Sequence, residues 1–308
     1  MKDSKKVYRE IIFLHQLNKH PNIVFLRDVI KTNRDIYLIL EFVETNLSSI
    51  CQTKILRDKH KQYIAYQLFK VLKYIHSADL IHRNLRPTNI LITKDCEVKI
   101  TDFGLTKIKD QKEEADYDLP GYLSLNYYKS PEVLIGGCTC IDSSSDMWSL
   151  GCILAEMFTG NIIFKSGSIR NQLELIIKVL GKPNREEIAS LKTDLAAGYF
   201  QRELIFDEQI DLKSFLYNVP SDAFDLILQL IVFNPSKRLT AKEGLKHKYF
   251  KEFHNPDDEI DFNGKLSLNV IEDYHQDKYT TITKNSLTIN NIRRTTTTYA
   301  SKCSMNYT

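Results

Sequence analysis

The chain has 308 residues, of which 43% are hydrophobic, enough to bury a sizeable core in one large domain or two lobes. Its formal net charge of +3 is too small to predict nucleic-acid binding. No apolar run reaches the length of a membrane span, and the N-terminus is charged where a signal peptide would be apolar. We therefore expect a soluble, cytoplasmic protein without nucleic-acid or membrane partners.

The six cysteines contain no CxxC pair and no regular spacing. Such a distribution is typical of thiols in a reducing compartment. The cysteines therefore predict neither a zinc site nor a disulfide framework.

The predicted elements begin with a helix over residues 7–17, where apolar side chains recur at helical spacing. A second helical pattern over 56–76 predicts a long core helix. Short strands are predicted at 23–30 and 35–42, joined as a hairpin, and at 89–93 and 97–101. Helical periods dominate the later chain, so the order predicts an α+β fold with an α-rich second half.

Five motifs follow one another in the order found in eukaryotic protein kinases. They are "HRNLRPTN" at 82–89, "DFG" at 102–104, "SPE" at 130–132, "DMWSLGCILAEM" at 146–157, and Arg238 within "NPSKRLT". From Glu10 to about residue 250 the chain resembles a protein kinase domain that begins at its C-helix. The resemblance implies a kinase-like fold with a truncated small lobe, made of that helix and a short hairpin, and a mainly α-helical large lobe.

Several segments are similar to MAP kinases, in particular to the atypical extracellular-signal-regulated branch associated with cilia. They include "REIIFLHQLNKHPNIV", "LEFVETNL" and "FHNPDDEI". The resemblance implies a residual small lobe, a large lobe, an extension that packs toward the small lobe, and a basic tail. We expect these parts at 1–46, 47–262, 263–284 and 285–308.

The catalytic loop departs from the kinase pattern at the position of its aspartate. Asn84 stands there, and a neutral amide cannot take a proton from an attacking hydroxyl. Arg86 replaces the loop lysine, and Leu125 replaces the activation-segment threonine that completes the same polar network. The resemblance therefore implies a degenerate catalytic site, although drift in an enzyme that tolerates these changes is an alternative.

Nucleotide binding is expected to be weak or absent, and no cofactor is required. Asn89 and Asp102 occupy the family's magnesium positions, but a buried Asp and Asn there also form hydrogen bonds with the local backbone. The remaining cofactor positions are the hinge residues Leu40, Glu41 and Val43 and the adenine-floor residue Leu91. The family's glycine-rich loop and the lysine that pairs with Glu10 precede the first residue, unless the gene start is wrong.

The regulatory positions are also altered. The "TEY"-like triplet of MAP kinases corresponds to Pro120, Gly121 and Tyr122, which excludes dual phosphorylation, although Arg83 keeps the place of a phosphate-binding arginine. Asn126 replaces the arginine that shapes the pocket for a substrate proline. The scaffold is retained instead. His82, Phe103 and Leu14 match the apolar spine, Asp146 matches the anchor of the catalytic loop, and Glu132 with Arg238 match the buried ion pair.

Two features predict a protein partner. The strand near Tyr37 would have a bare edge that can accept a partner strand, unless the C-terminal extension covers it. After Asp277 all charged residues are basic, which suits an acidic surface such as tubulin in an axoneme, or a simple solvated tail. An acidic docking patch is expected at Asp257, Asp258 and Glu259, although such a run is often only a solvated turn.

The sequence therefore favours a MAP-kinase-like pseudokinase that acts as a structural or scaffolding component, with tubulin or axonemal proteins as its expected partners in the cilium. The alternative is an active or weakly active serine/threonine kinase whose N-terminal strands are missing from the sequence.

Overall fold

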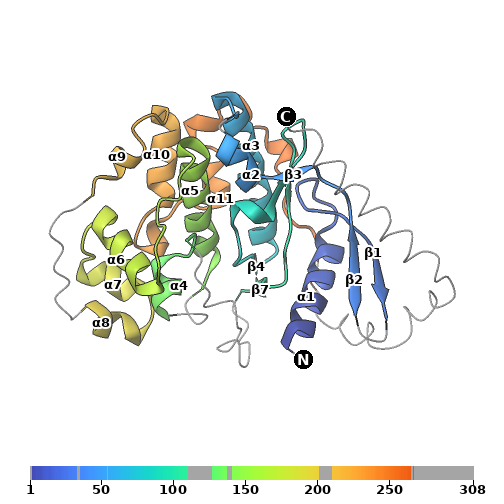
Figure 1. The fold of residues 1–308 in the computed structure, drawn as a ribbon, viewed down its shortest axis with the longest axis horizontal. Helices are drawn as coiled ribbons and strands as arrows, with labels where there is room; N and C mark the ends of the chain where they lie inside the picture. The colour runs from blue at the N-terminus through green and yellow to red at the C-terminus, as the bar shows by residue number, and fades with distance from the viewer. Residues whose placement is uncertain are drawn as a thin grey trace. The chain divides into compact units, whose positions relative to one another are not determined.

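The computed structural model describes residues 2–32, 35–53, 55–109, 127–136, 141–200, 210–264 and 266 (Figure 1). The chain divides into two compact units, one made of residues 1–26 and 40–266 and the other of residues 27–39 and 267–308. The expected boundary at residue 46 stays a prediction, and the expected parts beyond residue 266 lie outside the described residues.

The first unit is mainly helical. Its α-helices are α1 (Lys2–Leu17), α2 (Leu47–Thr53), α3 (Asp58–Ser77), α4 (Pro131–Gly136), α5 (Ser143–Thr159), α6 (Ile169–Leu180), α7 (Arg185–Ser190), α8 (Asp194–Phe200), α9 (Leu212–Phe215), α10 (Ser221–Leu230) and α11 (Ala241–Gly244). Its 3₁₀ turns are η1 (Pro87–Asn89), η4 (Pro235–Lys237), η5 (Lys248–Phe250) and η6 (Pro256–Asp258). Among the described residues, no helix combines the length and apolar character that a membrane crossing requires.

Helix α3 confirms the predicted core helix. Its apolar side chains at Ile64, Leu68, Leu72 and Ile75 recur every three or four residues and are all buried, so one face of the helix lies in the core. Arg57 precedes it and Ser77 ends it. The prediction placed its limits within two residues of those in the structure.

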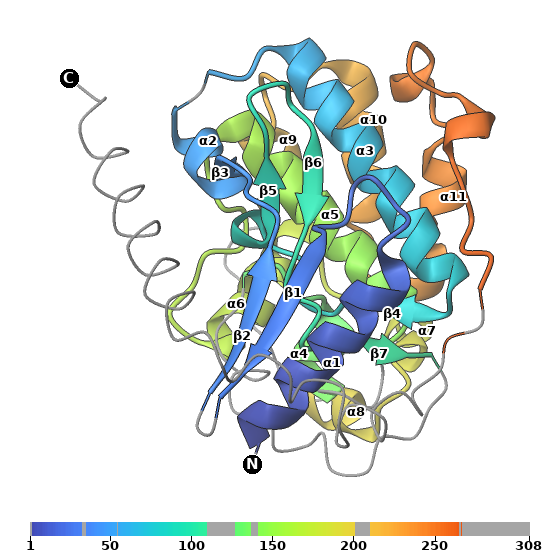
Figure 2. The same ribbon diagram turned by 90° about the vertical axis from the view of Figure 1, so that its right-hand side faces the viewer.

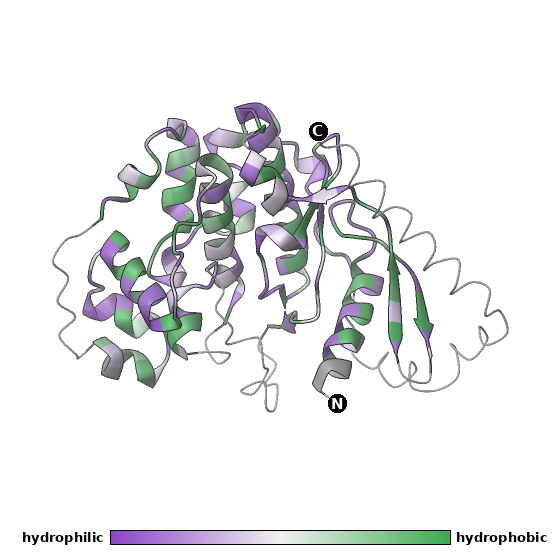
Figure 3. Cartoon of the chain, in the orientation of Figure 1, coloured by the Kyte–Doolittle hydropathy of each residue, from purple (hydrophilic) through white to green (hydrophobic). Residues whose placement is uncertain are grey.

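Helix α5 lies between α3 and α10 in the helical core (Figure 1). It begins where Asp142 accepts a hydrogen bond from the Ser144 amide at 2.8 Å, and it ends at Gly160, whose φ of 73° is left-handed. Its buried Trp148 stacks on Phe164 with ring centroids 5.5 Å apart. Figure 3 shows the hydrophobic residues along α5 and α10 in green, consistent with their burial.

Short strands hold the segments that carry the site (Figure 2). Strands β3 (Thr45–Asn46), β5 (Ile90–Ile92) and β6 (Val98–Ile100) form a sheet of order β3-β5-β6, and β4 (Leu80–Ile81) pairs antiparallel with β7 (Lys107–Ile108). In the β5–β6 pair, Ile90 lies opposite Ile100. The residue before β5 and the residue after β6 therefore lie side by side.

The predicted N-terminal hairpin is present as β1 (Leu26–Lys31) and β2 (Ile36–Leu40). The turn is closed by a hydrogen bond from the Thr32 amide to the Asp35 carbonyl at 2.8 Å. The expected start of β1 at Ile23 is wrong, because Ile23 instead forms a parallel bridge with Ile100. Strand β1 begins only at Leu26, after that bridge.

Candidate functional site

The β5–β6 pair brings two polar residues together at one end of the sheet. The Thr101 amide donates to the Asn89 carbonyl at 3.1 Å, which extends the ladder by one step. Asp102 follows immediately, so its carboxylate lies beside the Asn89 side chain. Hydrogen-bond register, rather than proximity in sequence, therefore builds this part of the site.

Asp146 on α5 anchors the backbone of the loop that begins at His82. Its carboxylate is 1% exposed and accepts hydrogen bonds from the His82 amide at 2.8 Å and the Arg83 amide at 2.9 Å. His76 lies 3.0 Å from the same carboxylate. Burial alone would raise the pKa of Asp146, but the hydrogen bond and charge of His76, together with the His82 contacts, lower it. The anchor expected at this position is present.

Two residues of the site have left-handed backbone, Arg83 with φ of 65° and Asp102 with φ of 67°. Neither is glycine, so each conformation costs energy that the surrounding contacts must offset. The Arg83 amide is held by Asp146, and its guanidinium Nε donates to the Leu105 carbonyl after the "DFG" segment. The strained loop is therefore tied to both α5 and the "DFG" segment.

The Asn84 side chain points at Asp102. Its Nδ2 donates to Asp102 Oδ2 at 2.7 Å. Asn89 Nδ2 donates to the same oxygen at 3.0 Å and to the Asn84 carbonyl at 3.0 Å. One carboxylate oxygen thus accepts two amide N–H groups, and the degenerate catalytic position belongs to the same cluster as both expected metal positions.

The amide orientations follow from their partners. Asn84 faces a carboxylate, and Asn89 faces a carboxylate and a carbonyl, so only nitrogen can form these bonds. A carboxylate and an amide oxygen would suit Mg²⁺, but here Asn89 presents nitrogen to Asp102. Arranged in this way, the two residues do not fit a divalent cation between them.

Glu10 on α1 lies near this cluster. Burial raises its pKa to about 7, and the negative charge of Asp102 adds to the shift. Among the described residues Glu10 makes no ion pair. Helix α1 passes close to the "DFG" segment, since a Cβ added at Gly104 would lie 3.4 Å from the Lys6 carbonyl oxygen.

The expected hinge residues Leu40, Glu41 and Val43 and the expected adenine-floor residue Leu91 are partly exposed. The Glu41 carboxylate accepts from the Phe25 amide at 2.7 Å and pairs with Lys99 at 2.9 Å. Its backbone amide donates to the Phe25 carbonyl at 2.9 Å. Glu41 therefore holds the segment after β2 to both residue 25 and strand β6.

The expected spine residues Leu14, His82 and Phe103 are all fully buried. The His82 and Phe103 rings meet edge to face, with centroids 4.9 Å apart. Burial lowers the pKa of His82, so the ring packs in its neutral form.

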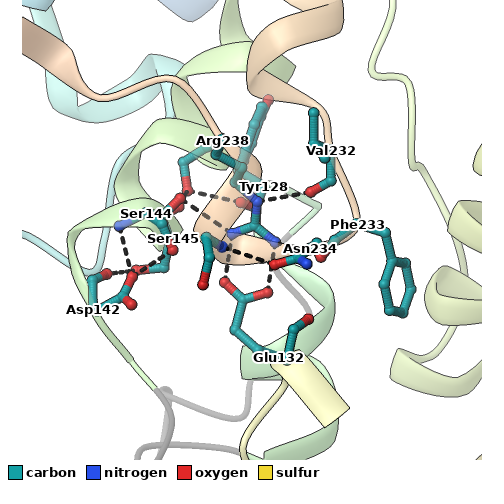
Figure 4. A network of polar contacts seen from close by, with 12 residues as sticks. Tyr128, Glu132, Asp142, Ser144, Ser145, Val232, Phe233, Asn234 and Arg238 are labelled. Carbon is teal, nitrogen blue, oxygen red and sulfur yellow. Dashed lines mark hydrogen bonds and ion pairs between the residues drawn. The ribbon is translucent and has the colours of Figure 1, made fainter. Parts of the chain in front are cut away.

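The expected ion pair between Glu132 and Arg238 is present and bidentate, at 2.6 and 2.7 Å (Figure 4). Both side chains are almost wholly buried. Arg238 also donates to the carbonyls of Val232, Phe233 and Ser144 and lies 5.0 Å above the Trp148 ring. The guanidinium therefore ties the "SPE" segment to α5 and to the turn after α10.

Other expected positions stay predictions. Arg86 is exposed, and its side chain forms no hydrogen bond or ion pair within the described ranges, so the role expected for it beside Asn84 is not tested. Tyr122, Leu125 and Asn126 lie outside the described residues.

The expected docking patch needs a correction at one residue. Glu259 is 6% exposed and turns inward, where its carboxylate accepts from Tyr66 OH at 3.1 Å and lies 2.7 Å from His254. The outward-facing acids of this turn are Asp257 and Asp258. A docking role therefore remains a prediction for these two only.

Sequence reasoning missed two buried polar networks. Asn22 donates to Gln67 Oε1 at 2.9 Å and to the Val98 carbonyl at 2.8 Å, which joins the residues after α1 to α3 and β6. Tyr128 OH donates to Glu156 at 2.5 Å. The "HPN" triplet at 20–22 was a signal for the first network, because a buried Asn after Pro must satisfy its amide.

Comparison with known proteins identifies the class. Residues 1–250 match the protein kinase domain, so the chain belongs to the protein kinase family and has its fold. Within that family it is of the MAP-kinase type. It is 41% identical over 273 residues to "Extracellular signal-regulated kinase 2" of Dictyostelium discoideum, covering 87% of this chain and 73% of the relative.

Two further relatives support this assignment. The chain is 39% identical to "Mitogen-activated protein kinase 15" of Caenorhabditis elegans, covering 83% of this chain and 56% of the relative. It is 36% identical to "Mitogen-activated protein kinase 2" of Pneumocystis carinii, covering 82% and 73%. The chain spans about half the length of several of the kinase 15 relatives.

Proposed function

We infer that this MAP-kinase-type domain is a pseudokinase that acts by binding other proteins. One observation carries the proposal. The residue at the proton-accepting position, Asn84, is a neutral amide that cannot take a proton from a hydroxyl, and its Nδ2 donates to Asp102. Loss of a positioned general base reduces the rate by about 10²- to 10⁴-fold.

The retained scaffold supports a binding role. Asp146 still holds the loop, and Arg238 still pairs with Glu132, so the fold keeps its stabilising contacts while the chemistry is impaired. We propose that Asp257 and Asp258 receive a basic partner segment and that the basic residues after 277 bind an acidic surface. Tubulin in an axoneme is the partner proposed for that tail, and the cilium is the location proposed for the protein.

The second candidate is a weakly active serine/threonine kinase. It is favoured by residue identity alone, because Asn89 and Asp102 keep the residue types of the family's magnesium positions. This candidate requires a base-independent reaction, with rates far below those of an intact kinase.

Phosphate transfer from γ-labelled ATP to a generic basic protein separates the two. The proposal predicts that the wild-type chain labels the substrate no faster than Asp102→Asn, which removes the metal-facing carboxylate. Labelling well above this background would support the weakly active kinase. In parallel, binding of a basic peptide should be weakened about tenfold by Asp257→Asn with Asp258→Asn and unchanged by Asp102→Asn.

A further inference from the structure

We propose that Asn84 closes the divalent-cation site of this domain, so that Asp102 is satisfied by protein amides in place of a metal ion. This inference rests on the proposed function, because it assumes that the cleft does not carry out phosphate transfer. It goes further by assigning to Asn84 a role against metal binding that the loss of a base does not require.

The first step is the hydrogen-bond inventory of Asp102. Its Oδ2 accepts from Asn84 Nδ2 at 2.7 Å and from Asn89 Nδ2 at 3.0 Å. These positive N–H groups occupy the direction from which a cation would approach that oxygen. Its Oδ1 accepts no hydrogen bond from the described residues, so a single oxygen of the pair remains for a metal.

The second step concerns Asn89. Its amide has two hydrogens, and both are used, one on Asp102 and one on the Asn84 carbonyl. Its oxygen lies on the opposite side, 3.4 Å from the Thr88 hydroxyl. To coordinate a metal together with Asp102, Asn89 must give up its hydrogen bond to the carboxylate.

The third step is charge. Mg²⁺ and Mn²⁺ are held by oxygen ligands, and affinity rises with the number of carboxylates. An aspartate at position 84 would repel Asp102 and attract a cation between them. Asparagine reverses both effects, because it removes one negative charge and adds an N–H donor for the other. The identity of one side chain therefore decides whether the Asp102 carboxylate binds a cation or accepts hydrogen bonds from the neighbouring amides.

Binding of Mn²⁺ alone to the full chain, measured by electron paramagnetic resonance, tests this directly. We expect Asn84→Asp to bind Mn²⁺ at least tenfold more tightly than the wild-type chain. Adding Asp102→Asn to that variant should abolish the gain, which places the ion at this cluster. Asn184→Asp is the matched control, since it makes the same charge change at the N-cap of α7, where aspartate caps equally well.

Equal Mn²⁺ affinity in the wild-type and Asn84→Asp chains, whether tight or undetectable, would overturn the proposal, as would an equal gain in Asn184→Asp. These outcomes are independent of phosphate transfer by the wild-type chain. An inactive wild-type chain with equal Mn²⁺ affinities would reject only this inference, whereas an active wild-type chain would reject the proposed function.

Discussion

Asn84 and Asp102 are joined by a 2.7 Å hydrogen bond from amide nitrogen to carboxylate oxygen. In a protein kinase the residue at position 84 is an aspartate, and two carboxylates at this distance would repel each other unless a proton or a cation lay between them. The substitution therefore converts a repulsive pair into an attractive one. It removes a proton acceptor and supplies a hydrogen-bond donor to Asp102 at the same time.

Because Asn84 donates to Asp102, we expect that restoring the aspartate typical of kinases at position 84 makes the chain less stable. Asn84→Asp should lower the free energy of unfolding by about 1–3 kcal/mol in EDTA, because a hydrogen bond is replaced by like-charge repulsion. Asn84→Ala should cost less, since it removes the bond without adding a charge. Urea denaturation of both variants measures the difference, and an Asn84→Asp chain as stable as wild type in EDTA would contradict the prediction.

The Glu132–Arg238 pair predicts a large effect on stability. Arg238→Met should cost about 3–5 kcal/mol, because it leaves the Glu132 carboxylate buried without its partner. Lys237→Met is the control, since the adjacent Lys237 pairs with Glu186 at 3.0 Å on the surface. That pair should contribute about 0–1 kcal/mol. Similar losses in the two variants would show that burial does not determine the contribution of Arg238.

Gly244 predicts a clash that sequence pattern alone does not reveal. A Cβ at this position would overlap the Phe69 ring, so Gly244→Ala should cost about 1–3 kcal/mol through overpacking between α11 and α3. Gly167 has no atom within 4 Å of an added Cβ, so Gly167→Ala should be near neutral. Thermal denaturation compares the two, and a neutral Gly244→Ala would mean that α11 does not pack against Phe69 as described.

His20 predicts a dependence of stability on pH. Burial, with a smaller contribution from Lys70, lowers its pKa to about 3. In the unfolded chain His20 takes up a proton near pH 6.5, whereas in the folded chain it stays neutral there. The free energy of unfolding therefore decreases as the pH falls below about 6.5. Between pH 7.5 and pH 5 this amounts to about 2 kcal/mol.

The His20 contribution is isolated by comparison with His20→Gln, which cannot titrate. The stability of the wild-type chain should fall more steeply than that of the variant over this range, as measured by urea unfolding at several pH values. Parallel curves would contradict the prediction. The ring packs 4.8 Å from Tyr74, so the variant is expected to be less stable at neutral pH as well.

The sequence predicted the fold through long-period patterns and ordered motifs. Helix α3 follows from its apolar spacing, and the Glu132–Arg238 pair follows from the place of each residue in the kinase pattern. The direction of the Asn84 side chain could not be predicted, because it depends on the register of β5 and β6 that brings Asp102 beside Asn89. An amide beside a carboxylate was nevertheless foreseeable once both positions were assigned.

The inward turn of Glu259 shows a different limit. Its neighbours Asp257 and Asp258 are exposed, and nothing in three consecutive acids distinguishes the one that packs inward. Its carboxylate is held inside by Tyr66 in α3, which is distant from Glu259 in the sequence, and by His254, which is close to it in the sequence. Partners supplied by tertiary structure decided the outcome at this position, rather than local composition.

The most direct test of the central claim is single-turnover transfer of the γ-phosphate by the purified chain at saturating Mg²⁺ and ATP. Because Asn84 cannot accept a proton and its amide is bonded to Asp102, we predict that the wild-type time course is indistinguishable from that of Asp102→Asn. A wild-type rate near the 1–100 s⁻¹ typical of protein kinases, and absent in Asp102→Asn, would contradict the claim.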